Sequence, residues 1–281
     1  AAGAVAAAYI GKQAGFENLS ACDMGGTSFD VSLILGGAPA LSAEKDLAYG
    51  VPVRVPMVDI HTIGAGGGSI AHVDAAGLLR VGPESAGAEP GPICYGRGGR
   101  RPTVTDANLV LGRVDPSGFA GVSEARGTAA VADALQSAVG DPLSLDVAGA
   151  ADAVLAVAGN QLASAIRLVS IEKGHDPRDF VLFAFGGAGP LHAVELAREL
   201  SIPRVLVPRF PGITSALGCL LSDLRHDYVH SLWSPLSDVD PDEVDEIFSK
   251  QAVRGVEAIK SDGVPVDAEE VIHEADLMYR G

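Results

Sequence analysis

Cysteine and aromatic residues are scarce in this sequence of 281 residues, which has three cysteines and an aromatic content of 5%. Cys22, Cys94 and Cys219 lie far apart and form no CxxC pair. This spacing argues against the disulfide framework of small secreted proteins and against the common structural zinc sites. We therefore expect reduced thiols and a cytoplasmic protein.

Positive charge is also in short supply. The sequence has 20 Lys and Arg residues against 36 Asp and Glu residues, which gives a net charge of −16. Such a charge disfavours nucleic acid and anionic membrane surfaces as partners. We expect neither a signal peptide nor a membrane span, because no uncharged run is long enough to cross a bilayer. If a nucleotide binds, backbone N–H groups and a metal ion must supply most of the attraction.

Glycine and small apolar residues are abundant instead: 35 residues are glycine and 47% are hydrophobic. The length and this composition predict a globular α/β protein of one or two domains. The sequence starts at Ala1 without methionine and stops at Gly281 directly after an apolar–polar run. We therefore expect it to be a fragment of a longer chain.

The stretch from Asp23 to Asp30 organises the chain, because an apolar approach precedes it and a β-prone run follows it. We predict antiparallel strands at residues 19–22 and 31–35, joined by a glycine turn in which a positive φ is permitted. The two aspartates flank this turn, where they could hold a hydrated Mg²⁺ ion.

The turn itself consists of Gly25, Gly26, Thr27 and Ser28. Successive N–H groups of such a turn can form a concave anion site, and the two hydroxyls add polar groups. The functional interpretation is a hairpin that binds phosphate. The alternative is an ordinary turn with polar flanks, because short motifs also occur by chance.

A second glycine cluster, residues 64–69, is denser and includes Gly66 and Gly67. Such a loop suits the wrapping of a ligand or of another backbone segment. Asp59 and His61 precede it at alternating positions of a predicted strand, so they would share one face. They are candidates for acid–base catalysis or metal ligation, and the alternative is a buried polar pair at the end of a strand.

A long loop, residues 82–99, leads to a helix that is predicted at residues 107–111 with Thr105 or Asp106 as its N-cap. Loops of this length inside a compact domain are usually functional or disordered. Asp106 is therefore a candidate catalytic residue, and helix capping is its alternative role.

Residues 180–185 form a continuous apolar run that predicts a buried strand. A glycine turn, the helix 191–200 and the strand 205–207 follow, which together make a βαβ unit. Ligands of open α/β sheets bind at the carboxyl ends of the strands, and the helix N-terminus adds a positive dipole. The turn's candidate binding residues are Gly186, Gly187 and Gly189.

The rest of the chain is predicted from periodicity and capping signals. His192 is expected on the surface of its helix. The further predicted strands are residues 40–49, 70–74, 78–81, 223–233 and 271–279, and residues 40–45 should join the hairpin as an adjacent antiparallel strand. The further predicted helices are residues 1–14, 128–139, 146–174, 214–221 and 240–260.

Several motifs in order give the sequence a family resemblance. They are Asp23 to Ser28, Asp59 to Ala71, Val81 to Gly87, Pro90 to Gly96, Thr103 to Asn108 and Phe185 to His192. Together they resemble the hydantoinase A/oxoprolinase family, which includes N-methylhydantoinase, 5-oxoprolinase and the ATP-using subunits of acetone and acetophenone carboxylases. The resemblance covers nearly the whole chain.

The resemblance implies a lobe of an ATPase of the actin/hexokinase/Hsp70 class, with a mixed sheet and flanking helices. Residues 1–235 would be the second ATPase lobe, and residues 236–281 a helix and strand that begin a truncated segment. ATP and Mg²⁺ would bind, with Asp23 and Asp30 on the metal. The first lobe's phosphate loop should precede Ala1, so the isolated fragment is expected to be inactive.

The resemblance also implies a reaction. The γ-phosphoryl group of ATP moves to an amide or lactam oxygen, and water then completes the hydrolysis of a cyclic amide substrate. Two alternatives remain open: an ATP-using subunit of a ketone carboxylase, and a nucleotide-binding module without catalysis. A second subunit of hydantoinase B type and homo-oligomer formation are implied as well.

Overall fold

The computed structural model describes residues 1–42, 45–47, 51–53, 57–115 and 128–279. The chain divides into two compact units. The first unit is residues 1–42 with 57–222, and the second is residues 43–56 with 223–281.

The first unit is built on a mixed sheet with the strand order β12-β11-β1-β2-β3, and β8 also pairs with β2. β1 is antiparallel to β2 and parallel to β11, and β11 is parallel to β12. The predicted hairpin, the predicted βαβ unit and the mixed α/β class are therefore confirmed. The strands are β1 (Leu19–Met24), β2 (Phe29–Leu35), β3 (Ala38–Pro39), β8 (His61–Ile63), β11 (Val181–Phe185) and β12 (Val205–Leu206).

The third strand predicted at residues 40–45 is wrong in its register. Gly36 and Gly37 adopt φ values of 57° and 83° and form a tight turn, so that Leu35 already pairs with Ala38. The chain then leaves the sheet: β4 (Leu41–Ser42) pairs with β7 (Met57–Val58) in a separate two-stranded ladder. Residues 43–44 and 48–50 of the prediction lie outside the described part.

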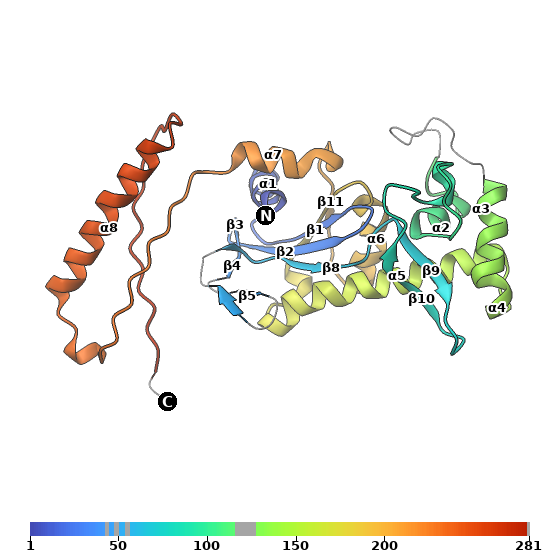
Figure 1. Ribbon diagram of the computed structural model, residues 1–281, viewed down its shortest axis with the longest axis horizontal. Helices are drawn as coiled ribbons and strands as arrows, with labels where there is room; N and C mark the ends of the chain where they lie inside the picture. The colour runs from blue at the N-terminus through green and yellow to red at the C-terminus, as the bar shows by residue number, and fades with distance from the viewer. Residues whose placement is uncertain (43–44, 48–50, 54–56, 116–127, 280–281) are drawn as a thin grey trace. The chain divides into compact units, whose positions relative to one another are not determined.

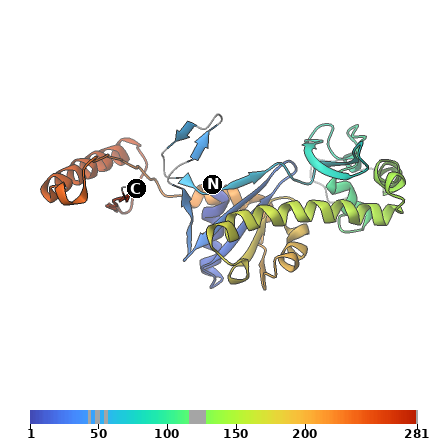
Figure 2. The ribbon, with the colours of Figure 1, turned by 90° about the horizontal axis from the view of Figure 1, so that it is seen from below.

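Helices cover both faces of the sheet, as Figures 1 and 2 show. α1 (Ala2–Gln13) and α7 (Thr214–Leu221) pack on one face, where small residues of α1 meet Leu19, Phe183 and Phe185. α5 (Val147–Ser170) and α6 (Gly189–Glu199) cover the opposite face, where the other half of each strand is buried.

α5 continues past the sheet into a second apolar cluster. Asp146 caps its start by accepting a hydrogen bond of 2.7 Å from Gly149 N. By length and composition α5 could cross a membrane, but half of its apolar stretch is buried in this unit, as in the core helix of a globular protein. The cluster also contains β9 (Ser69–Val73), β10 (Leu79–Ser85), α2 (Val104–Val110) and α3 (Thr128–Leu135), and beside these lie the π-turn Gln136–Gly140 and α4 (Asp141–Leu143).

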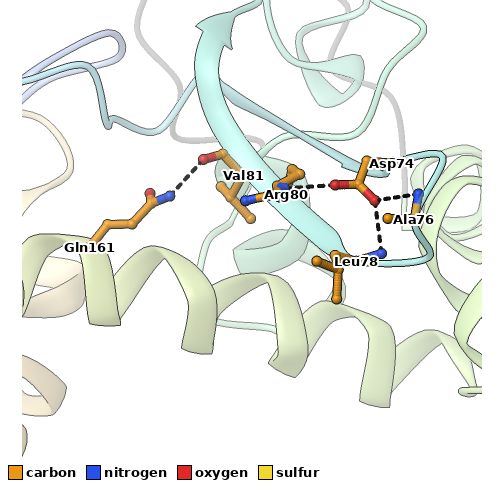
Figure 3. A network of polar contacts seen from close by, with 6 residues as sticks. All are labelled: Asp74, Ala76, Leu78, Arg80, Val81 and Gln161. Carbon is orange, nitrogen blue, oxygen red and sulfur yellow. Dashed lines mark hydrogen bonds and ion pairs between the residues drawn. The ribbon is translucent and has the colours of Figure 1, made fainter.

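The β9–β10 hairpin is fixed at its tip and at its base (Figure 3). Asp74 accepts hydrogen bonds from Ala76 N, Leu78 N and the Arg80 side chain at its tip. At the base, Gln161 on α5 donates to Val81 O over 3.0 Å. This strand-to-helix bond holds the hairpin on the helix that also carries the sheet.

The second unit contains a two-stranded ladder, β5 (Lys45–Leu47) with β6 (Val51–Val53), and α8 (Pro241–Ser261). Asp240 caps α8 as predicted, accepting from Asp242 N. The strands predicted at residues 223–233 and 271–279 are wrong, because these described residues form no ladder with any described neighbour, and a strand requires a hydrogen-bonded partner.

Short 3₁₀ turns complete the chain. They are Ile93–Tyr95, Ile171–Lys173, Pro177–Asp179, Pro211–Ile213 and Leu236–Asp238.

Candidate nucleotide site

Asp23 and Asp30 form a facing pair across the β1–β2 hairpin. Strand alternation places both side chains on the face that carries α1 and α7. Each carboxylate accepts one hydrogen bond from a hydroxyl outside the hairpin: Ser215 Oγ donates to Asp23 over 3.0 Å, and Thr62 Oγ1 donates to Asp30 over 2.6 Å. The pair is therefore oriented by residues far away in the sequence.

Burial raises the pKa of the Asp23 carboxyl above its ordinary value. The hydrogen bond from Ser215 lowers it in part, and the charge of Asp30 raises it further. The two carboxylates lie in a cavity of about 320 Å³. Its polar lining, besides the two aspartates, comes from Ser32 and Ser215 and from the exposed thiol of Cys219.

The turn between the two aspartates has its carbonyl groups bonded and most of its N–H groups unbonded. Gly25 O accepts from Gly67 N over 3.0 Å, and Gly26 O accepts from Gly68 N over 2.6 Å. Gly25 N donates to the carbonyl of Ser28. Within the part of the chain that the structure describes, the N–H groups of residues 26–28 donate to no other atom. The turn therefore presents donors without acceptors.

The second glycine cluster, residues 64–69, packs on this turn, and the close packing leaves no space for side chains at Gly66 and Gly68. A Cβ on Gly66 would lie 2.6 Å from Gly26 C and Thr27 N, and a Cβ on Gly68 would lie 2.9 Å from Gly26 O. Thr105 holds the same loop by donating Oγ1 to Gly67 O over 2.8 Å. The loop thus wraps another backbone segment, which is one of the two roles expected for it.

Gly25 and Gly26 are different, because they do not use the positive φ that glycine permits. Neither has a φ in the left-handed region, and a Cβ on either would meet no atom within 4 Å. The docked loop fixes the turn through its carbonyls, so a left-handed residue is not required. Glycine at these positions leaves open space above the unbonded N–H groups.

The turn after β11 meets the hairpin as predicted. Gly186 has φ 84°, and a Cβ there would collide with Asp23 Oδ1 and Met24 O. Ala188 N donates to Met24 O over 2.9 Å. The prediction that residues 64–69 and 186–190 lie near the Asp23 turn is confirmed.

Asp59 and His61 do not share one face of a strand, so that expectation is wrong. β7 ends at Val58 and β8 begins at His61, because the chain changes partner from β4 to β2 between them. Asp59 forms an ion pair with Lys173. Thr62 faces Asp30, and its neighbour His61 therefore faces the α5 side.

His61 lines a separate open groove of about 620 Å³ on that side. Its other polar lining residues are Asn160, Gln161 and Ser164, all on α5. The structure therefore does not bring His61 to the hairpin carboxylates.

Asp106 is fully buried and acts as a helix cap and loop anchor. Its carboxylate accepts from Thr103 N and Cys94 N, both over 2.9 Å, and from Ile93 N over 3.1 Å. The N-cap of α2 is Thr103, which forms a capping box with Asp106. The expected N-caps, Thr105 and Asp106, lie two and three positions too late. This geometry supports the structural alternative for Asp106.

His192 is 2% exposed rather than on the helix surface, so that prediction is wrong. The first turn of α6 faces α2, where Asn108 Nδ2 lies 3.5 Å from His192 Nε2. Burial lowers the pKa of His192 to about 4. A single sequence does not reveal this helix contact, which buries the ring.

Sequence reasoning missed Thr62, Thr105 as a loop anchor, and Ser215. Strand alternation could have identified Thr62, because it is the residue of β8 that faces Asp30. No local signal identifies Ser215, because its role depends on how α7 packs.

Taken together, three glycine-rich turns surround a carboxylate pair on a mixed α/β sheet. Residues 1–228 match the Hydantoinase/oxoprolinase family, and the chain belongs to that family. It is 42% identical to the caprolactamase subunit alpha of Pseudomonas jessenii, over 95% of this chain and 39% of the relative.

Two solved structures have the same fold. The ATP-dependent caprolactamase of Pseudomonas jessenii matches with a TM-score of 0.81 and 39% identity over 95% of this chain. Nucleotide-free acetone carboxylase matches with a TM-score of 0.78 and 30% identity, also over 95%. The chain spans 39% of each of these proteins, so it corresponds to a part of them.

Proposed function

We propose that this chain is the nucleotide-binding part of an ATP-dependent hydrolase that acts on cyclic amides, of the hydantoinase/5-oxoprolinase type. The unbonded N–H groups of residues 26–28, beside the Asp23–Asp30 pair, carry the proposal. Phosphate oxygens are the acceptors that such a row of donors fits. The likeness to an ATP-dependent caprolactamase supports the class of reaction.

The three glycine turns have separate roles in this proposal. Gly25, Gly26, Thr27 and Ser28 bind the phosphates, and Gly66 and Gly67 hold that turn in place. Gly186, Gly187 and Gly189 lie on the nucleoside side, where Gly187 has open space around it. The chemistry is thereby assigned to the hairpin, not to Asp59, His61 or Asp106.

The residues present fit Mg²⁺. The site offers two carboxylates and the hydroxyls of Ser32, Thr62 and Ser215 but no imidazole. Mg²⁺ binds through a few carboxylates, phosphate oxygens and water. Asp23 and Asp30 would hold the ion, which, when bound, neutralises negative charge on the phosphate oxygens. With a net charge of −16, the chain has no long-range attraction for a polyphosphate and depends on these local groups.

The proposed reaction activates a poor electrophile. The amide oxygen forms a bond to the γ-phosphorus of ATP, and the bond from that phosphorus to ADP breaks. Water then adds to the amide carbon, and the C–N bond breaks as the ring nitrogen takes up a proton and leaves as the amine. A second water hydrolyses the resulting acyl phosphate, which releases inorganic phosphate and gives the open-chain amino acid. The protein's own contribution is to position the phosphates and to stabilise their charge.

The likeness to acetone carboxylase favours a second candidate function, the ATP-using part of a ketone carboxylase. There the activated carbon would be joined to another carbon instead of to water. Both candidates use the same turns and carboxylates, so the hairpin does not discriminate between them.

The mixed sheet with helices on both faces is consistent with one lobe of an actin/hexokinase/Hsp70-type ATPase, in which a second lobe holds the phosphates from the other side. Under this proposal a partner subunit or domain completes the enzyme. Residues 1–281 alone should then show no measurable ATP hydrolysis. Each charge-assisted hydrogen bond that the missing lobe would supply contributes about 1.5–3 kcal/mol to the free energy of ATP binding.

Phosphate release by the complete natural polypeptide that carries this chain tests the function. Hydantoins, 5-oxoproline and caprolactam should stimulate it, whereas acetone or acetophenone with bicarbonate should not. Stimulation by the ketones only would establish the second candidate. Robust hydrolysis by residues 1–281 alone would contradict the two-lobe proposal.

A further inference from the structure

Ser215 is the second residue of α7, and its hydroxyl reaches the carboxylate of Asp23. Ser215 Oγ donates to Asp23 Oδ2 over 3.0 Å. The other oxygen, Oδ1, lies against Gly186, where a Cβ would collide with it. Asp23 is therefore held between α7 and the turn at residues 186–190, here called the nucleoside-side turn.

The segment before α7 is attached to that same turn. Gly186 N donates to Pro211 O over 3.0 Å, and the 3₁₀ turn Pro211–Ile213 leads directly into α7. Thr214 Oγ1 donates back to Phe210 O over 3.2 Å and fixes the junction. The position of Ser215 thus depends on the turn at Gly186.

α7 is also closely packed on α1. A Cβ on Gly218 would overlap the Ala2 carbonyl, and a Cβ on Gly3 would lie 3.0 Å from Ser215 Oγ. This close packing leaves the Ser215 hydroxyl little freedom to move away from Asp23.

Asp23 needs such a donor because its neighbour repels it. Asp30 faces it across the hairpin, and its charge raises the pKa of Asp23. Thr62 donates to Asp30 from β8, which pairs with β2. Asp23 thus approaches Gly186 directly through Oδ1, and the hydrogen bond from Ser215 adds a second link, through the segment that Pro211 attaches to the Gly186 turn.

We propose that Ser215 is a positioning residue that fixes the Asp23 carboxylate for the metal–nucleotide complex and connects it to the nucleoside-side turn. The inference rests on the proposed nucleotide-binding function. It predicts that loss of the hydroxyl weakens the metal-dependent part of nucleotide binding and leaves the metal-independent part unchanged.

The test compares Ser215→Ala with Ser215→Thr and Ser222→Ala in the complete natural polypeptide. Ser222 is the matched control, because it follows the last residue of the same helix and its hydroxyl donates only to Gly218 O, over 2.7 Å. Calorimetry would measure ADP binding with EDTA and across a Mg²⁺ titration, and thermal unfolding would confirm that each variant folds.

We expect Ser215→Ala to raise the Mg²⁺ concentration for half-maximal ADP binding about tenfold, the low end for a hydrogen bond to a charged group. ADP affinity in EDTA should match that of Ser222→Ala, and Ser215→Thr should restore the Mg²⁺ midpoint. Equal midpoints for folded Ser215→Ala and Ser222→Ala would overturn the inference. Equal midpoints for folded Ser215→Ala and Ser215→Thr would overturn it too. If the unmutated polypeptide binds no nucleotide, the proposed function itself fails.

Discussion

Two glycine pairs, Gly25–Gly26 and Gly36–Gly37, form hairpin turns at opposite ends of β2. Both pairs have open space around them, but their φ values and the acceptors of their N–H groups differ. A Cβ on Gly25, Gly26, Gly36 or Gly37 would meet no atom within 4 Å. Gly36 and Gly37 have left-handed φ values, and their N–H groups donate to Asn18 Oδ1 and Glu17 O. Gly25 and Gly26 have ordinary φ values.

The difference shows what distinguishes a site from a turn. The Gly36 turn uses glycine for its backbone angles, and its donors are satisfied within the chain. At the Gly25 turn the carbonyls are bonded by the loop at residues 66–68, so the donors of residues 26–28 stay unbonded. Under the proposed function, these unbonded donors in open space, rather than the glycine content, bind the phosphates.

The largest expected effect is on nucleotide binding by Gly26→Ala. The added methyl group lies in the open space where phosphate would approach, and it would displace acceptors from at least two N–H groups. Two lost charge-assisted bonds of about 1.5–3 kcal/mol each would lower ATP affinity by about 10²–10⁴-fold. The free energy of unfolding should be unchanged or slightly higher, because alanine restricts the unfolded chain. Calorimetry with Mg-ATP and chemical denaturation measure the two quantities.

Acidification should lower the free energy of unfolding, because His192 is buried beside the site. The two glycine turns should therefore be compared above about pH 6.5. The folded-state pKa of His192 is about 4, below about 6.5 for an unfolded chain, so the unfolded state takes up the proton first. Stability is present above about pH 6.5 and should fall by about 3 kcal/mol as pH drops to about 4. Denaturation at several pH values should show a flatter curve for His192→Gln. The exposed His72 offers the control substitution, His72→Gln, and a slope for His192→Gln as steep as the unmutated one would refute the assignment.

Gly36→Ala should have the opposite effect to Gly26→Ala. Its φ of 57° is left-handed, where an alanine costs about 1–2 kcal/mol. We expect the free energy of unfolding to fall by that amount while Mg-ATP affinity stays unchanged. A loss of nucleotide affinity comparable to that of Gly26→Ala would remove the distinction between the two turns.

The smallest effect is expected at Thr105, which anchors the loop behind the Gly25 turn. Thr105→Val removes the side-chain donor to Gly67 O but leaves the hydrogen bond from Thr105 N, and it should cost about 1 kcal/mol of stability. Because the loop holds the carbonyls of the turn, nucleotide affinity should also fall severalfold. Thr105→Ser keeps the hydroxyl and should behave as the unmutated protein; if Val and Ser are equivalent, the anchor is unimportant.

The structural features that depend on short segments could be predicted from the sequence alone. The hairpin, the βαβ unit and the helix starts at Asp146 and Asp240 follow from local patterns of apolar, glycine and capping residues. The meeting of the three glycine turns was also predictable, because it followed from their resemblance to one family's motifs.

The predictions that proved wrong concern features that depend on contacts with residues distant in the sequence. After β3 the chain leaves the sheet because β4 pairs with the distant β7, and His192 is buried by its contact with α2. Ser215 carries no motif, and its bond to Asp23 arises only when α7 packs on α1. Asp59 and His61 were predicted to share a face of one continuous strand. In the structure the chain pairs with β4 before Asp59 and with β2 from His61 onwards.

Amide hydrogen exchange, read at residue resolution in the complete natural polypeptide, tests the central claim most directly. Without nucleotide, the amides of Gly26, Thr27 and Ser28 should exchange rapidly, and those of Gly36 and Gly37 should be protected by their acceptors. Saturating Mg-ATP analogue should protect the first set and leave the second unchanged. Unaltered exchange at residues 26–28 with bound nucleotide would contradict the assignment of this turn as the phosphate site.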